Sequence, residues 1–242
     1  MSATPGVLHD EVALGAVRLV LTGDVDLGRV DDGAGRTSVA RALGVPTERL
    51  LLPTQVHGDR VVEATGPWPG PAPEADAVLV RGDRLEAPLA VGVRAADCMP
   101  LLLADPDAGV AAAVHVGRRG LQLGIARRAV RALRAAGARR VVARAGPTVC
   151  GRCYEVPDAL RAEVATAVPE AAATTRIGTP AVDIVAGVRA QLARPADPVL
   201  DGGPVALDLA WCRCTLESPD LASHRRDATP RRHAAVVVVD PA

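Results

Sequence analysis

The feature that most restricts the fold of this 242-residue chain is a set of short apolar runs joined by very short connections. One run ends just before Asp97, a second extends from Leu101 to Ala104, and a third extends from Gly109 to Val116. Runs of this length that end at glycines or turn residues predict buried strands. A parallel pair needs a crossover of about a dozen residues or more, so these neighbours can pair only in an antiparallel fashion.

Helical patterns alternate with the predicted strands. The spacing of Leu121, Ile125, Ala129 and Leu133 predicts one helix from Leu121 to Ala136. Other helices are expected at Arg36–Leu43, after Pro157 and from Val185 to Leu192. The expected fold class is α+β, a single-domain mixed α/β sandwich over residues 1–242, with largely antiparallel or mixed sheets flanked by helices.

Composition limits the partners of such a domain. The chain has two Trp, one Tyr and no Phe, which argues against the aromatic platforms that bind nucleic-acid bases. Its 28 basic and 28 acidic residues balance, so neither nucleic acid nor an anionic membrane is an expected partner. The sequence shows no membrane-spanning run and no secretory signal, and it has five cysteines, an odd number. We therefore expect a cytoplasmic protein with free thiols, as a monomer or weak homodimer.

Three predicted strand ends carry His57, Cys98 and His115. His57 precedes a Gly58-Asp59 turn signal, Cys98 follows the run that ends before Asp97, and His115 stands where the third run ends. Two imidazoles and a thiol suit zinc with a fourth position open to water or substrate. The intervals between them match no short zinc-finger pattern, so the fold would have to bring the three side chains together.

The segments QVHGDRV (55–61), RAADCMPLLLAD (94–105) and AAVHVGRRGL (112–121) resemble, in this order, three signature segments of the bacterial laccase-domain family. Its members are variously described as multicopper polyphenol oxidases, purine nucleoside phosphorylases and peptidoglycan-editing factors. AGPTVCGRCYEV (145–156) and SHRRDATPR (223–231) extend the resemblance towards the C-terminus. The resemblance covers most of the chain from Gln55 onwards.

The resemblance implies that His57, Cys98 and His115 are metal-binding and catalytic positions. It also implies that Arg119 contacts substrate or phosphate, whereas Arg118 replaces a tryptophan that is usual in the family. The segment from Leu21 to Gly28 lacks the Arg-x-Gly-Gly loop of the family, and SHRRD replaces Ser-Tyr-Arg-Arg-Asp, so this chain resembles a divergent member with altered specificity.

Several polar residues have both a structural and a functional interpretation. Arg225 and Arg226 could bind phosphate or carboxylate together with Arg119, or form a salt-bridged corner with Asp227. Asp97, next to the Cys98 thiol, could orient a ligand.

The remaining cysteines and histidines carry weaker signals. Cys150 and Cys153 have C-x-x-C spacing but no second pair, so we expect structural or incidental thiols. Cys212 and Cys214 alternate on a strand-like segment and are expected to pack on opposite faces. We expect His9 and His233 at the surface, and His224 has only a weak case for lining the cleft.

The leading functional hypothesis is a zinc-dependent purine nucleoside phosphorylase acting on adenosine, inosine or methylthioadenosine, with adenosine deamination at the same site as a further activity. The same three residues would also serve an amidase that edits a peptidoglycan precursor with Cys98 as nucleophile. A copper polyphenol oxidase is a third alternative, although five histidines are few for several copper centres. The fourth is a non-enzymatic metal-binding protein.

Overall fold

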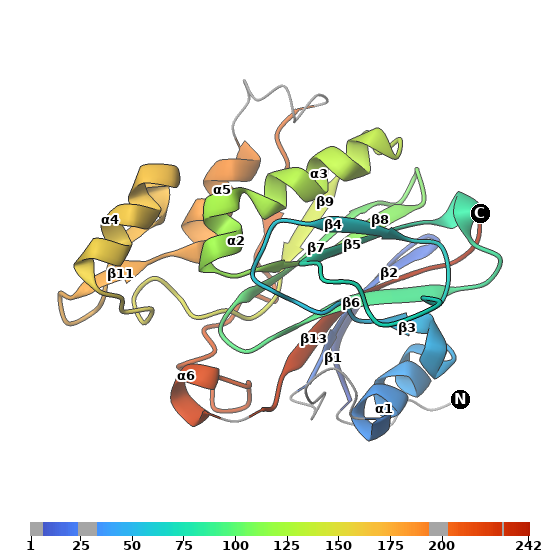
Figure 1. The fold of residues 1–242 in the computed structure, drawn as a ribbon, viewed down its shortest axis with the longest axis horizontal. Coiled ribbons are helices and arrows are strands. Elements are labelled where there is room, and N and C mark those ends of the chain that lie inside the picture. Colours follow the sequence, from blue (N-terminus) through green and yellow to red (C-terminus); the bar gives the residue numbers. More distant parts are fainter. Residues whose placement is uncertain (1–6, 24–32, 194–202, 229) are drawn as a thin grey trace.

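A computed structural model describes residues 7–23, 33–193, 203–228 and 230–242, in which two large sheets pack face to face with helices outside each (Figure 1). The helices are α1 (Gly33–Leu43), α2 (Arg118–Leu123), α3 (Ile125–Ala135), α4 (Asp158–Ala167), α5 (Ile184–Ala193) and α6 (His224–Asp227). Short 3₁₀ helices cover Thr47–Arg49, Gly82–Arg84 and Pro169–Ala171.

The first sheet has the order β1-β2-β13-β6-β3. Its strands are β1 (Leu8–Leu14), β2 (Val17–Thr22), β13 (His233–Val239), β6 (Leu89–Ala95) and β3 (Leu50–Leu51). All pairs are antiparallel except β3 with β6. The central strand, β13, comes last in the chain order and pairs with both β2 and β6.

The second sheet has the order β12-β9-β7-β8-β5-β4. Its strands are β12 (Leu207–Asp208), β9 (Val142–Ala145), β7 (Met99–Asp105), β8 (Val110–Val116), β5 (Ala77–Arg81) and β4 (Val61–Ala64). The inner pairs are antiparallel, and each edge strand is parallel to its neighbour. A separate hairpin joins β10 (Ala172–Thr174) to β11 (Pro180–Val182).

Three apolar clusters hold these layers together. One fills the space between the sheets, with Leu19, Val91 and Leu102 among its members. Another lies between the second sheet and the helices α2 to α5, and the third lies between the first sheet and α1. Burial of apolar side chains in these clusters is the main stabilising contribution. These side chains are almost all aliphatic, because the chain has few aromatic residues.

The predicted class, a mixed α/β sandwich of antiparallel and mixed sheets flanked by helices, is confirmed. Two local predictions were wrong. The helix expected over Leu121–Ala136 is divided at Gly124, and His233 is fully buried in β13 rather than exposed. Gly124 divides the helix because it adopts a left-handed conformation, with φ of 78°.

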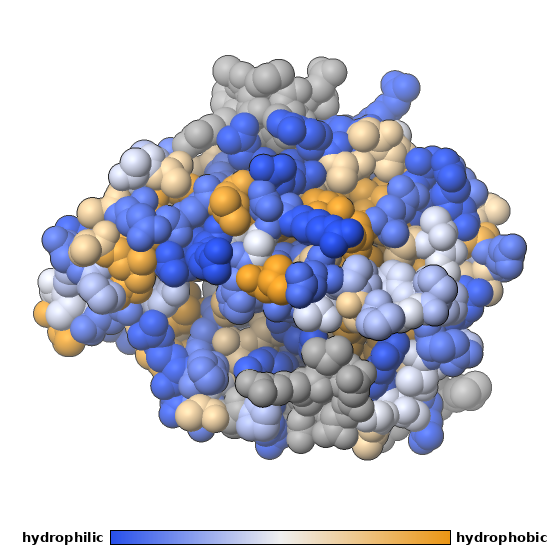
Figure 2. Space-filling view, viewed as in Figure 1, coloured by the Kyte–Doolittle hydropathy of each residue, from blue (hydrophilic) through white to orange (hydrophobic). Residues whose placement is uncertain are grey.

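The face of the molecule seen in Figure 2 is mainly hydrophilic, with small hydrophobic areas separated from one another. None of the helices in the described part of the chain is long and apolar enough to cross a membrane. The segment from Leu21 to Gly28, which was expected to lack the Arg-x-Gly-Gly loop, lies largely outside the described residues.

The ends of the inner strands position the candidate site. The turn between β6 and β7 carries Cys98, and His115 is the penultimate residue of β8. His57 lies in the connection between β3 and β4. The start of β7, the end of its antiparallel neighbour β8 and the loop that carries His57 therefore meet at one end of the second sheet. The short connections in the sequence require this arrangement.

Candidate functional site

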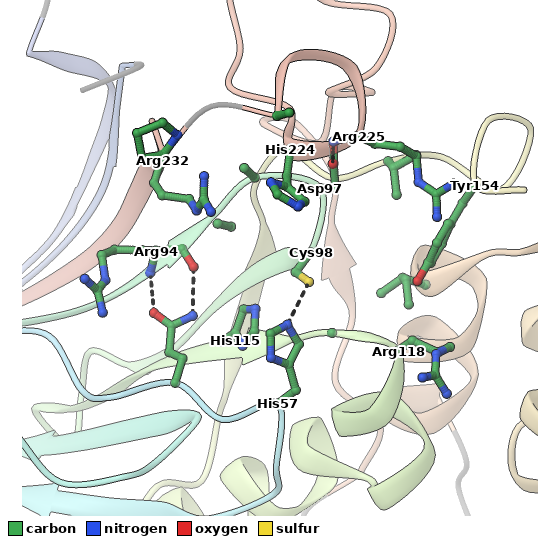
Figure 3. A pocket seen from close by; sticks show the side chains of 18 of the residues that line it. His57, Arg94, Asp97, Cys98, His115, Arg118, Tyr154, His224, Arg225 and Arg232 are labelled. Atoms are coloured by element: carbon green, nitrogen blue, oxygen red, sulfur yellow. Dashed lines mark hydrogen bonds between the residues drawn. The ribbon is translucent and has the colours of Figure 1, made fainter. Parts of the chain in front are cut away.

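His57, Cys98 and His115 converge at this end of the second sheet, and their potential ligand atoms all lie within 4.8 Å of one another. The Cys98 Sγ is 3.8 Å from the His57 Nε2, and the two imidazole rings meet edge to face with centroids 4.8 Å apart. His115 is buried, whereas His57 is exposed, so the cluster has a closed side and a side open to solvent. Figure 3 shows the three side chains pointing towards one another.

Asp76 holds both histidines in place. Its Oδ1 lies 2.8 Å from the His115 Nδ1 and accepts a hydrogen bond of 3.0 Å from the His57 backbone N–H. The other carboxylate oxygen accepts bonds from the N–H groups of Val56 and Gly58. Because His115 Nδ1 faces the carboxylate, its Nε2 is left for a metal ion, an arrangement typical of histidine ligands.

Close approach and backbone strain accompany this geometry. His57 and Asp97 have φ of 58° and 86°, in the left-handed region that residues other than glycine rarely adopt. A Cβ added to Gly117 would lie 2.7 Å from the His57 Cδ2 and 3.2 Å from the Cys98 Sγ. Only glycine at this position allows the loop of His57 to approach the end of β8.

The cluster is electrostatically coupled. Burial alone would raise the pKa of Cys98, but hydrogen bonds and charges from His115 and His57 lower it to about 6. Burial would likewise lower the pKa of His115, but Asp76 and Cys98 raise it to about 9. Burial also opposes ionisation of Asp76, yet the His115 ring and backbone N–H groups lower its pKa. At neutral pH the metal-free site therefore holds a thiolate beside an imidazolium.

Asp97 joins the site to distant loops. Its Oδ1 accepts hydrogen bonds of 2.7 Å from the hydroxyls of Thr215 and Ser223, and its Oδ2 accepts one of 2.7 Å from the Arg225 N–H. Its carbonyl accepts bonds from the Val149 N–H and the Thr148 hydroxyl. These contacts fix the walls around Cys98, so Asp97 positions loops in this structure.

A pocket of about 880 Å³ surrounds the cluster. Arg118, Tyr154 and Arg225 lie on one side of it, and Arg94 and Arg232 lie on the other (Figure 3). The Arg225 guanidinium stacks over the Tyr154 ring at 4.8 Å from its centroid. A pocket of this size with arginines on both sides suits an anionic or phosphate-containing ligand.

The other predicted site residues fall both inside and outside the pocket. Arg225 and His224 line it. Arg119 is exposed and is not among the lining residues, whereas Arg118 is. The Arg226 guanidinium donates to backbone carbonyls of the corner before α6 and pairs with Asp227, which is the structural arrangement considered for it.

Sequence reasoning missed the roles of Asp76 and Tyr154. A single acidic residue such as Asp76, which stands directly before an apolar run, carries no distinctive pattern in the sequence. Tyr154 is the only tyrosine of the chain and follows the C-x-x-C motif directly, a signal that could have drawn attention to it.

Among the cysteines outside the pocket, Cys214 departs from expectation. Cys214 lies in a turn region and meets Cys150, Cys153 and Glu217, with all four potential ligand atoms within 4.8 Å of one another. The prediction that Cys212 and Cys214 lie on opposite faces of one strand was wrong, because the strand there ends at Asp208. Cys212 packs, half-buried, against the cluster beneath α2 to α5, and His9 is exposed as expected.

Comparisons with known proteins agree on the family. A family model described as multi-copper polyphenol oxidoreductase laccase matches residues 29–240. A purine nucleoside phosphorylase of Streptomyces coelicolor is 46% identical, over 99% of this chain and 91% of its own length. One of Streptomyces griseus is 45% identical, over 93% of this chain and 91% of its own length.

Solved structures share the fold. The crystal structure of protein NMB0706 of Neisseria meningitidis has a TM-score of 0.75 and 24% identity, and the match covers 97% of this chain and 99% of that one. YlmD of Geobacillus stearothermophilus has a TM-score of 0.73 and 21% identity, over 98% and 100% of the two chains.

Proposed function

Because the chain belongs to the multi-copper polyphenol oxidoreductase laccase family, whose curated relatives include purine nucleoside phosphorylases, we propose that it is a zinc-dependent purine nucleoside phosphorylase. The proposed substrates are adenosine, inosine or methylthioadenosine together with inorganic phosphate. Adenosine deamination at the same site is a further proposed activity. We also propose that the protein is cytoplasmic, because its five free cysteines are consistent with a reducing compartment.

The observation that supports this function most is the position of the His57, Cys98 and His115 cluster inside a pocket with arginines on both sides. The volume of about 880 Å³ is in the range of small-molecule sites and can accommodate a nucleoside and a phosphate. The Tyr154 ring offers an apolar face for the base or sugar, and the neighbouring guanidinium groups offer donors for the phosphate.

The ligand set fits a zinc ion. Two imidazoles and a thiol converge within 4.8 Å, and the Asp76 carboxylate orients His115 from behind. Three protein ligands leave one position for substrate or water, the pattern of catalytic rather than structural zinc. A bound zinc would supply Lewis-acid polarisation of an oxygen atom. Copper is the alternative metal, since imidazole and thiolate also bind it.

The proposed reaction replaces the bond between ribose C1′ and the base nitrogen with a bond between C1′ and a phosphate oxygen. The base leaves with the bonding electron pair and takes up a proton. We assign phosphate binding to Arg225 and Arg118, which line the pocket, in place of Arg119, which does not line it. Arg226 contributes by fixing the corner that carries Arg225.

The test is turnover of adenosine, inosine and methylthioadenosine with and without phosphate, with free base and sugar phosphate measured by chromatography. We expect phosphate-dependent release of base and formation of ribose 1-phosphate. The Cys98→Ala variant should lose this activity and the metal of the pocket. Base release at the same rate without phosphate would replace the proposal with hydrolysis.

One observation favours a second function. Cys98, with its pKa near 6 and His57 Nε2 at 3.8 Å, has the features of an activated nucleophile for cleavage of an amide, such as one in a peptidoglycan precursor. A chelator separates the two proposals. Removal of the metal should abolish phosphorolysis, whereas an amidase that uses the free thiolate should remain active or gain activity.

A further inference from the structure

A second cluster of potential ligands lies outside the pocket, formed by Cys150, Cys153, Cys214 and Glu217. The Cys153 thiol lies 3.2 Å from the Glu217 Oε1, and the Cys150 N–H lies 3.5 Å from the Cys214 Sγ. None of these residues lines the pocket or belongs to the His57, Cys98 and His115 cluster.

The backbone fixes this arrangement from two sides. The turn from Cys150 to Cys153 is closed by hydrogen bonds of 2.9 Å from the N–H groups of Cys153 and Tyr154 to the Cys150 carbonyl. Gly151 packs so tightly that an added Cβ would lie 2.6 Å from the Asp183 Cβ. The side chains of Cys150 and Cys153 are therefore presented by a rigid turn.

Backbone pairing aligns the second segment with the first. Cys214 forms a parallel bridge with Thr148, two residues before Cys150. The N–H groups of Glu217 and Ser218 donate to the Cys214 carbonyl, which returns Glu217 to the cluster. Residues about 64 positions apart in the sequence thus meet through paired backbone.

We propose that Cys150, Cys153, Cys214 and Glu217 bind a structural zinc ion that joins the two segments. Tetrahedral zinc with Zn–S distances of about 2.3 Å places its sulfur ligands roughly 3.8 Å apart, so ligand atoms within 4.8 Å need only a small contraction. Three thiols and a carboxylate form a closed set of four ligands, typical of structural rather than catalytic zinc.

The surroundings support a cation with thiolate ligands. Three thiolates and a carboxylate around Zn²⁺ carry a net negative charge, and Arg176, which pairs with Glu217, partly offsets it. Arg152, on the same turn, adds a second positive charge near Glu217. A disulfide would use only two of the three thiols and would give the carboxylate no role.

This ion would stabilise the pocket from behind. Tyr154 directly follows Cys153, and the segment after Glu217 leads to Ser223 and Arg225, which bind Asp97. Tyr154 and Arg225 stack on each other across these two segments (Figure 3). A zinc ion at the second cluster would hold together the two chain segments that form this wall, independently of the reaction in the pocket.

The experiment measures zinc per chain by elemental analysis in the full-length protein purified under reducing conditions. We expect the Cys98→Ala variant to retain about one zinc ion, and we expect that ion to be lost when Cys214→Ser or Cys150→Ser is added. Cys212→Ser in the same background is the matched control and should retain it, because Cys212 lies outside the cluster. Replacement of zinc by Co²⁺ should give intense thiolate-to-cobalt charge-transfer absorption in the control but not in Cys214→Ser.

A second measurement applies if the serine variants do not fold. In the folded Cys98→Ala protein, reaction of the remaining thiols with a disulfide reagent should be slow at three cysteines and should accelerate at least tenfold when a chelator removes zinc. Absence of metal from the reduced Cys98→Ala protein, or unchanged zinc in a folded Cys214→Ser form, would reject the proposal. A mass lower by two hydrogen atoms, with Cys150 bonded to Cys153 or Cys214, in protein kept reduced throughout would reject it in favour of a disulfide.

Discussion

At the residue scale, the site combines residues that a motif can reveal with others that only the fold can place. His57, Cys98 and His115 follow from strand ends and from the family segments. Asp76 holds two of them, yet the sequence gives it no distinctive context. The sequence also could not show which of the adjacent residues Arg118 and Arg119 lines the pocket. This depends on the position at which α2 begins.

Arg118 and Arg119 provide a matched pair of variants. Replacing Arg118 with Met should raise the KM for phosphate about 10- to 100-fold, since a hydrogen bond to a charged group contributes about 1.5 to 3 kcal/mol. Steady-state kinetics at varied phosphate would measure the change. The same substitution at the exposed Arg119 should leave the KM nearly unchanged, and the opposite ranking would restore Arg119 as the phosphate contact.

Gly117 is the residue that the close approach of His57 requires. In Gly117→Ala, the new Cβ would lie 2.7 Å from the His57 ring, so we expect His57 to shift and turnover to fall at least 10-fold, with weaker metal binding. Nucleoside turnover and metal content would be measured together. Gly66→Ala, in a loop with nothing within 4 Å of the added Cβ, is the control and should behave as the unchanged protein.

At the scale of elements, the sequence predicted the strands that carry the site and most of the helices, but not the interruptions of these helices. The apolar spacing of Leu121, Ile125 and Ala129 continues through Gly124, so periodicity alone cannot reveal that α2 and α3 are separate. The alternating exposure of β1 gives it a weak apolar signal, and it was overlooked. The bonds of Asp97 to loops 118 to 128 positions away have no signature in the local sequence.

The break at Gly124 gives a prediction about helix stability. Gly124→Ala should lower the free energy of unfolding by about 1 kcal/mol, because alanine strongly disfavours φ of 78°. Urea unfolding would measure this change. Gly33→Ala, at the exposed first residue of α1, should instead raise stability by about 0.4 to 1 kcal/mol, since φ there lies outside the left-handed region and the added Cβ meets no atom of the described residues within 4 Å. Equal effects at the two positions would contradict this explanation.

At the scale of the whole molecule, the packing of the layers buries His233, which we expected at the surface. β13 begins at His233, three residues before the valine run, and this places the imidazole in the interior of the first sheet. Burial lowers the pKa of His233 from 6.5 to about 4. The same packing that makes β13 the central strand thus keeps this ring neutral.

His233 makes stability depend on pH. Above pH 6.5 the ring is neutral in both the folded and the unfolded chain. As the pH falls from 6.5 towards 4, the unfolded chain binds a proton that the folded state excludes, so the free energy of unfolding decreases by up to about 3 kcal/mol. Urea unfolding at several pH values should show this loss, and His233→Gln should lack this part of it. Parallel pH curves for the two proteins would show that His233 is not responsible.

The position of β13 also affects how the chain acquires its structure. β2 and β6 do not pair with each other, because β13 lies between them. In the described part of the chain, β13 also follows every other strand in the sequence. During synthesis the edges of both strands therefore await a partner that is made later, while their apolar faces are already present. We expect a slow step dominated by long-range pairing, and a need for protection of these nascent edges from aggregation until β13 inserts.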